Sequence, residues 1–187
     1  MEAKIVYFER PGRENTSEVF RIVGQRAREL GIKTVVVAST QGDTAVQAVE
    51  ALKGLRVVIV THSQGLREPN INSFTEENRQ MVESKGGIIF TGTHLFAGIS
   101  RAIRNKFNTY VIGDLFASTL KVFGEAMKVV IEISVMAADA GLVRTDEPVI
   151  AIGGTGHGSD TAVVLTPANS QNFFDVKVHE ILCKPHL

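Results

Sequence analysis

The chain has 187 residues and a mass of 20.3 kDa, and its 20 Lys+Arg balance 20 Asp+Glu, so the formal net charge is zero. Hydrophobic residues make up 44% and charged residues 21%, which is typical of globular domains and excludes disordered, collagen-like and coiled-coil chains. A general nucleic-acid or anionic-membrane binder would carry a basic surplus, and this chain has none. We expect one domain over residues 1–187 and no nucleic-acid partner.

The cysteine content and the chain start predict a cytoplasmic protein. Cys183 is the single cysteine, so no intrachain disulfide or cysteine-based metal site can form. The first ten residues carry charges and a short apolar run, unlike a signal peptide. Residues 115–142 are the most membrane-like segment, but charged residues interrupt it, so we expect one mostly buried helix with a single wet edge and no membrane partner. The charges of that edge are Lys121, Glu125, Lys128, Glu132 and Asp139.

The first half of the chain alternates predicted strands with predicted helices. Asn15 followed by Glu18 resembles a capping box, and the three valines at 35–37 are typical of a strand buried on both faces. In chain order we expect a strand over 3–8, a helix over 15–30, a strand over 34–38, a helix over 44–52 and a strand over 57–61.

The second half continues this rhythm and then departs from it. We expect a helix over 76–84, a strand over 87–90, the long helix over 115–142, and strands over 148–152, 161–166 and 174–179. The last two strands have no helix between them and the preceding strand. The pattern predicts an α/β three-layer sandwich around a mainly parallel mixed sheet of five or more strands with an antiparallel edge.

Polar residues follow the predicted parallel strands, at the sheet edge where α/β proteins bind ligands. The loop Ser-Thr-Gln-Gly-Asp-Thr at 39–44 lies between a buried strand and a helix start, whose free N–H groups can hold a phosphate. Gly42 allows close approach of the backbone to a ligand, whereas an Asp43 carboxylate could cap the same N–H groups and leave an ordinary turn. The candidate residues of this loop are Ser39, Thr40, Gln41, Gly42 and Thr44.

A Gly-rich segment at 153–158, Gly-Gly-Thr-Gly-His-Gly, follows the strand predicted at 148–152. It is neither a dinucleotide fingerprint nor a Walker loop, and its glycines suit either an anion nest or a flexible hairpin turn. Because it lies at the same predicted edge as the first loop, we expect it to close over the phosphate. Its candidate residues are Gly154, Thr155, Gly156 and His157.

Histidines also follow the strands, but none has a second ligand at metal-binding spacing, so we expect no metal site. His62, Thr93 and Asn15 are expected to line the rest of the ligand site, and His94 is a further histidine at this edge. No G-x-S-x-G nucleophile motif occurs, and Cys183 is expected to pack as a small hydrophobic residue.

The segment over 12–62 resembles the C-terminal α/β domain of pyruvate kinase. The resemblance rests on Asn-Thr at 15–16, Val-Val-Val-Ala-Ser-Thr-Gln-Gly-Asp-Thr-Ala at 35–45 and Arg-Val-Val-Ile-Val-Thr at 56–61. In that enzyme the corresponding loop grips a phosphate of a sugar-bisphosphate effector, which implies a phosphate role for residues 39–44. The turn at 153–160 is similar to the second effector loop. Nothing in the chain matches the catalytic barrel, so pyruvate kinase activity is not implied.

The whole chain is similar to a family of stand-alone proteins, mainly archaeal, that are built on this domain. That family is associated with flavin mononucleotide (FMN), which implies FMN as the cofactor, with Phe96 or Phe116 beside its ring. Two alternatives are a non-catalytic module that binds a sugar phosphate and a flavin-dependent oxidoreductase. Uncovered apolar surface on the long helix would indicate a homo-oligomer.

Overall fold

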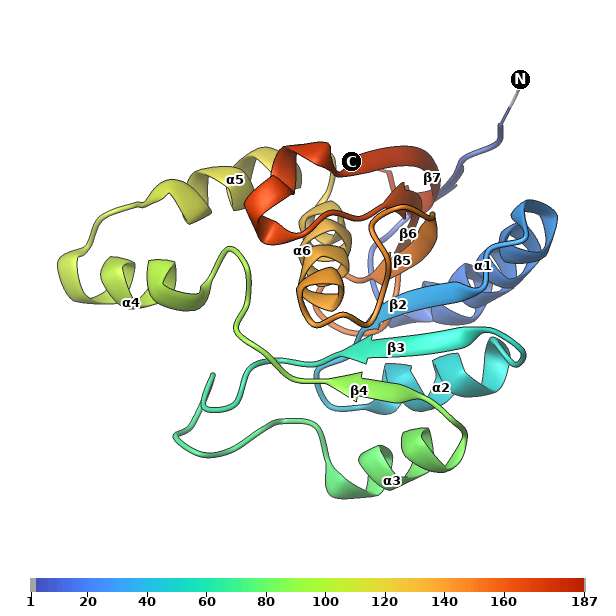
Figure 1. The fold of residues 1–187 in the computed structure, drawn as a ribbon, viewed down its shortest axis with the longest axis horizontal. Helices are drawn as coiled ribbons and strands as arrows, with labels where there is room; N and C mark the ends of the chain where they lie inside the picture. The colour runs from blue at the N-terminus through green and yellow to red at the C-terminus, as the bar shows by residue number, and fades with distance from the viewer. Residues whose placement is uncertain (1–2, 187) are drawn as a thin grey trace.

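In the computed structural model, which describes residues 3–186, seven strands form one mixed sheet in the order β1-β7-β6-β5-β2-β3-β4 (Figure 1). The strands are β1 (Val6–Phe8), β2 (Thr34–Ala38), β3 (Arg56–Val60), β4 (Ile88–Phe90), β5 (Val149–Gly153), β6 (Thr161–Thr166) and β7 (Lys177–Pro185). β6 runs antiparallel to both of its neighbours, and all other pairs are parallel. The mixed α/β architecture predicted from the sequence is confirmed.

Helices cover both faces of the sheet. The helical elements are η1 (Arg13–Asn15), α1 (Thr16–Leu30), α2 (Asp43–Ala51), α3 (Glu76–Ser84), α4 (Gly98–Phe107), α5 (Ile112–Lys121), α6 (Glu125–Asp139) and η2 (Ser170–Asp175). Side chains alternate between two cores because successive strand residues point to opposite faces. Val35 and Val37 of β2 pack with α1 and α2, whereas Val36 packs with α6. The three valines are fully buried, as a strand covered on both faces requires.

Several predicted elements match the structure. The strands at 34–38 and 161–166 and the helix at 76–84 have the predicted bounds, and α2, β3, β4 and β5 each differ by one residue at one or both ends. β1 begins at Val6, three residues later than predicted.

The sequence pattern predicted an antiparallel strand at the edge of the sheet, but the antiparallel strand lies inside it. β6 lies between β5 and β7, and the two edge strands are β1 and β4. β6 is antiparallel because it follows β5 through a short turn without a crossover helix. β1 comes from the opposite end of the chain and pairs in parallel with β7. The last strand was expected at the edge, but β1 takes that place. The alternating pattern at 174–179 is likewise only partly a strand, because η2 extends to Asp175.

The prediction of one long helix over 115–142 is wrong. It is two helices, α5 and α6, separated by residues 122–124. Gly124 has a φ of 124°, a backbone conformation that non-glycine residues rarely adopt, and it immediately precedes α6. The expected wet edge is also incomplete, because Glu132 is only 2% exposed. Helix α4 was not predicted.

The predicted capping box at Asn15 does not form. The Asn15 side chain makes no cap to α1 and instead donates through Nδ2 to the carbonyl oxygens of Arg10 and Gly12, at 2.8 and 3.3 Å. Cys183 is buried in β7, as expected, and burial raises the pKa of its thiol to about 12. Within residues 3–186, no helix combines the length and apolar character needed to span a bilayer.

Candidate functional site

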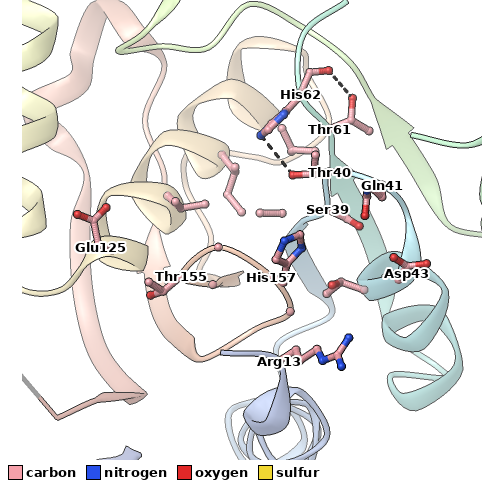
Figure 2. A pocket seen from close by; sticks show the side chains of 18 of the residues that line it. Arg13, Ser39, Thr40, Gln41, Asp43, Thr61, His62, Glu125, Thr155 and His157 are labelled. Atoms are coloured by element: carbon pink, nitrogen blue, oxygen red, sulfur yellow. Dashed lines mark hydrogen bonds between the residues drawn. The ribbon is translucent and has the colours of Figure 1, made fainter. Parts of the chain in front are cut away.

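A cavity of about 1370 Å³ opens beside the carboxyl ends of β2, β3 and β5 (Figure 2). It lies where the polar loops were predicted to meet, because the parallel strands all end at this edge. The predicted site residues that line it are Ser39, Thr40, Gln41, Thr44, His62, Gly154, Thr155, Gly156 and His157. Asn15, Gly42 and Thr93 were predicted with them but are not part of the cavity wall.

The loop between β2 and α2 presents a run of free backbone donors. Within residues 3–186, the N–H groups of the five consecutive residues 40–44 have no hydrogen-bond acceptor. The next N–H, of Ala45, donates to Oγ of Ser39 at 3.3 Å, which holds the loop against the first turn of α2. First-turn N–H groups point out of a helix end, where the dipole favours an anion. This geometry suits a phosphate.

The structure gives Gly42 a packing role that the sequence did not indicate. Its φ is 110°, and an added Cβ would lie 2.5 Å from Cβ of Asn78, so the site has no room for a side chain. Asn78 fixes the loop, since its Nδ2 donates to the carbonyl oxygen of Gln41 at 3.1 Å and to Oδ1 of Asp43 at 3.4 Å. The Asp43 carboxylate therefore bonds to the Asn78 side chain, and within residues 3–186 it accepts no hydrogen bond from the N–H groups at the start of α2.

The Gly-rich turn is held by a fully buried carboxylate. Oδ2 of Asp160 accepts hydrogen bonds from the N–H groups of Gly12 and Thr155, at 3.2 and 2.9 Å. Its Oδ1 accepts from Oγ1 of Thr161 at 2.9 Å. Part of the predicted anion nest is thus used within the protein. Figure 2 shows the His157 side chain between this turn and the loop that carries Asp43.

His62 lines the cavity and contacts the loop at 39–44. Its Nε2 lies 3.2 Å from Oγ1 of Thr40, and the dashed line in Figure 2 marks this contact. Burial is the main cause that lowers the pKa of His62 to about 4, and the neighbouring charges of His94 and Arg67 add to it. At neutral pH the ring is therefore uncharged, and it can exchange hydrogen bonds with a ligand without adding charge.

A partly buried cluster of His94, Lys128 and Glu132 forms another part of the wall, and the sequence analysis did not predict it there. Glu132 pairs with Lys128 one helical turn earlier, and its Oε1 accepts from the N–H of Phe96 at 3.0 Å. Nδ1 of His94 lies 3.5 Å from Oε2 of Glu132, and the His94 ring packs edge-on against His62 with centroids 5.3 Å apart. The sequence signal for this cluster was a pair of opposite charges, Lys128 and Glu132, four residues apart within a mostly apolar helix.

The pKa of Glu132 reflects competing effects. Burial alone would raise the pKa of this carboxyl, but its contacts with His94 and Lys128 outweigh burial and lower the pKa to about 2. Glu132 is thus a buried carboxylate that stays ionised, and the Lys128 ammonium lies beside it at the cavity wall.

Further cations border the cavity from segments that were not predicted to contribute. Arg13 comes from η1, Arg67 from the segment between β3 and α3, and Arg101 from α4. The basic residues are scattered over the sequence without a run, so no pattern signalled them. They meet only because the chain returns to this edge after each strand. Among residues 3–186, no group of three or more His, Cys, Asp and Glu side chains is arranged to hold a metal ion.

The aromatic platform predicted for a flavin ring is not in the cavity wall. Phe96 is 5% exposed and stacks on Phe116, with centroids 6.4 Å apart, and both contact Phe173 in a separate cluster. The apolar part of the wall instead consists of aliphatic residues, including Val129 and Ile133 of α6.

Comparisons with solved structures relate the chain to much longer proteins. It aligns with a pyruvate kinase from Cryptosporidium parvum at 8% identity and a TM-score of 0.38, covering 80% of this chain and 21% of that one. The same organism's pyruvate kinase in complex with ADP aligns at 12% identity and a TM-score of 0.40, covering 91% and 24%. An O-ureido-L-serine synthase aligns at 17% identity and a TM-score of 0.31, covering 73% and 49%. The chain thus spans about a quarter or less of the pyruvate kinases that it matches.

The sequence comparison covers most of the chain. The family model described as the pyruvate kinase alpha/beta domain matches residues 17–165, which include β2, the loop at 39–44 and the Gly-rich turn. The chain therefore belongs to the pyruvate kinase α/β domain family.

Proposed function

We propose that this protein binds a phosphorylated small molecule in the cavity at the carboxyl ends of β2, β3 and β5, with FMN as the first candidate. The observation that carries the proposal is the run of free N–H groups at 40–44, at the start of α2 and beside a cavity of about 1370 Å³. A phosphate would accept several of these hydrogen bonds, and the hydroxyls of Thr40 and Thr44 lie in the same wall.

The rest of the cavity has groups that suit the other parts of FMN. Val129 and Ile133 offer aliphatic contact to a flavin ring, and the uncharged His62 offers a hydrogen bond. The cavity volume exceeds the range of about 300–1,000 Å³ typical of small-molecule sites, so a ligand of FMN's size has room. When bound, the flavin would supply redox chemistry, and this chain's residues would hold and orient it. A cytoplasmic location is a further part of the proposal, whereas a flavin-dependent oxidoreductase activity is an alternative to simple binding.

A sugar phosphate is the second candidate, and the composition of the wall favours it. Among residues 3–186, no Phe, Tyr or Trp lines the cavity, whereas Arg13, Arg67, Arg101 and Lys128 do. Hydroxyl groups of a sugar would find many hydrogen-bond partners in such a wall, and a flavin ring would lack an aromatic partner to stack on. In this case the protein would act as a regulatory module without chemistry of its own.

The decisive experiment compares ligands with and without phosphate. FMN and riboflavin are titrated into the protein and followed by flavin fluorescence, and glucose 6-phosphate and glucose are compared by calorimetry. The proposal expects the phosphorylated member of at least one pair to bind at least tenfold more tightly, which corresponds to about 1.4 kcal/mol. FMN binding followed by reduction with NAD(P)H would support the oxidoreductase alternative.

A matched pair of variants locates the phosphate. Thr44→Glu adds a carboxylate at the first turn of α2, where it stabilises the helix but repels a bound phosphate. Thr44→Gln is similar in size and carries no charge. We expect Thr44→Glu to lose at least tenfold in affinity relative to Thr44→Gln. Equal affinities for the two variants would show that the phosphate does not bind at this loop, and no preference for phosphate in either pair of ligands would refute the proposed function.

A further inference from the structure

Exposed apolar side chains are concentrated in one part of the molecule. Of the fourteen large apolar residues that are exposed within residues 3–186, seven lie in residues 98–123, which we call the α4–α5 arm. The arm projects to the left of the sheet in Figure 1. Its seven side chains are 55–76% exposed, and Phe174, at 83%, packs beside α5 with its ring 5.8 Å from that of Phe116. Isolated exposed apolar residues are ordinary, but so many within one short projecting segment indicate an interaction surface.

Helix α4 contributes no buried residue to the core of the single chain. None of its ten residues is buried, and it packs mainly against α5. Yet its apolar residues recur at helical spacing, with Ile99, Ile103 and Phe107 along one side. An isolated helix of this length is marginal in water, so its stability must come from packing of the apolar face. In the single chain, however, Ile99 and Phe107 of that face are 75% and 66% exposed.

The exposed area matches what a stable protein interface needs. Four of these eight side chains are aromatic, and a fully covered aromatic side chain buries about 150–250 Å². With the four aliphatic side chains, and at 55–83% exposure, the arm and Phe174 together present on the order of 1,000 Å² of largely apolar surface. A stable interface of standard size buries about 800 Å² on each partner. One such contact would cover the arm.

The charges of the arm argue against an anionic membrane and against a strongly charged partner. Arg104 pairs with Asp114, and Lys121 pairs with Glu125. Arg101 lines the ligand cavity, which leaves Lys106 as the one arm cation that neither forms an ion pair within residues 3–186 nor borders the cavity. Binding to anionic lipid typically requires a cluster of 4–8 basic residues. A face that is apolar and poor in unpaired charge is instead typical of the interface between identical chains.

We propose that the α4–α5 arm is the contact surface for a second copy of this chain. In a two-fold dimer the same patch meets itself, so Phe107, Tyr110 and Ile112 of each copy are covered by the arm of the other. The dimer supplies the missing cover for α4. Because Arg101 lies in the first turn of α4, the dimer contact is built next to the ligand cavity.

The test measures the mass of the purified protein by light scattering after size-exclusion chromatography, over a wide range of concentrations. We expect a mass twice that of the 20.3-kDa chain. The double variant Phe107→Glu, Ile112→Glu places charges in the contact and should raise the dissociation constant by about thirtyfold or more. Ile71→Glu is the matched control, because Ile71 is also exposed, at 55%, but lies outside the arm. It should leave the dimer intact.

Several outcomes would overturn the proposal. One is a wild-type protein that stays monomeric at every concentration, and another is a dimer that the double variant does not weaken. A monomer that sediments with phosphatidylserine vesicles would identify a lipid surface as the occupant. Circular dichroism checks that the variants fold. If the double variant does not fold, hydrogen exchange of the wild type decides, since the amides of α4 should exchange more slowly as the concentration rises only if a second copy covers them.

Discussion

Acid should destabilise this protein partly through Glu132. Burial raises the pKa of this carboxyl, but the contacts with His94 and Lys128 outweigh burial and lower it from an ordinary 4.5 to about 2. The folded state therefore binds the proton less tightly than the unfolded state does. The resulting stability is present in full above about pH 4.5 and is lost as the pH falls toward about 2.

The size of the effect follows from the two pKa values. A tenfold change in proton affinity corresponds to about 1.4 kcal/mol, so lowering the pKa from 4.5 to about 2 contributes about 3 kcal/mol at neutral pH. About 2 kcal/mol of this should be gone at about pH 3. The Glu132 carboxylate is almost fully buried, so solvent screening reduces the figure little.

Urea unfolding of the wild type and of Glu132→Gln, followed by circular dichroism, tests this reasoning. At about pH 7 the variant should be less stable by about 3 kcal/mol, because Lys128 loses the partner of its partly buried charge. The difference between the two proteins should shrink by about 2 kcal/mol at about pH 3. Glu125→Gln removes an exposed carboxylate of the same helix and should change little at either pH. A difference between wild type and Glu132→Gln that is the same at both pH values would refute the argument.

Three further predictions concern the walls of the site. The lowered pKa of His62 should reduce stability as the pH falls from 6.5 to about 4, and His62→Gln should remove that part of the pH dependence in urea unfolding. Asp160→Ala should cost about 3–5 kcal/mol of unfolding free energy because it leaves one buried and two partly buried donors without an acceptor, whereas Asp160→Asn should cost less. Gly42→Ala should lower the thermal midpoint more than Gly54→Ala, since both have positive φ but only Gly42 lacks space for a Cβ; equal losses would contradict this packing argument.

The position of the loop at 39–44 could be predicted from the sequence because its determinants are local. A buried strand, a Gly-containing polar turn and a helix start follow one another between residues 34 and 51, and the carboxyl end of a parallel strand places such a turn at the edge where the cavity lies. The same local logic located the Gly-rich turn. It could not show that Gly42 faces Asn78, because that contact joins segments 36 residues apart.

The break between α5 and α6 shows a different limit. Residues 115–142 carry one continuous apolar pattern, and the sequence alone does not distinguish one long helix from two shorter ones joined at Gly124. The same ambiguity placed Glu132 on a wet edge. Only the packing of α6 against the sheet shows that Glu132 points toward His94 and the cavity, so that its charge is buried and compensated.

The α/β class, most element bounds and the two glycine-containing loops at the carboxyl edge of the sheet could be predicted from the sequence, because hydrophobic period and turn residues act over short distances. The fold was needed to show that the antiparallel strand lies inside the sheet, which cations border the cavity and which helices expose apolar side chains. These features depend on contacts between residues far apart in the chain. The order of these residues along the sequence does not indicate which of them meet in the fold.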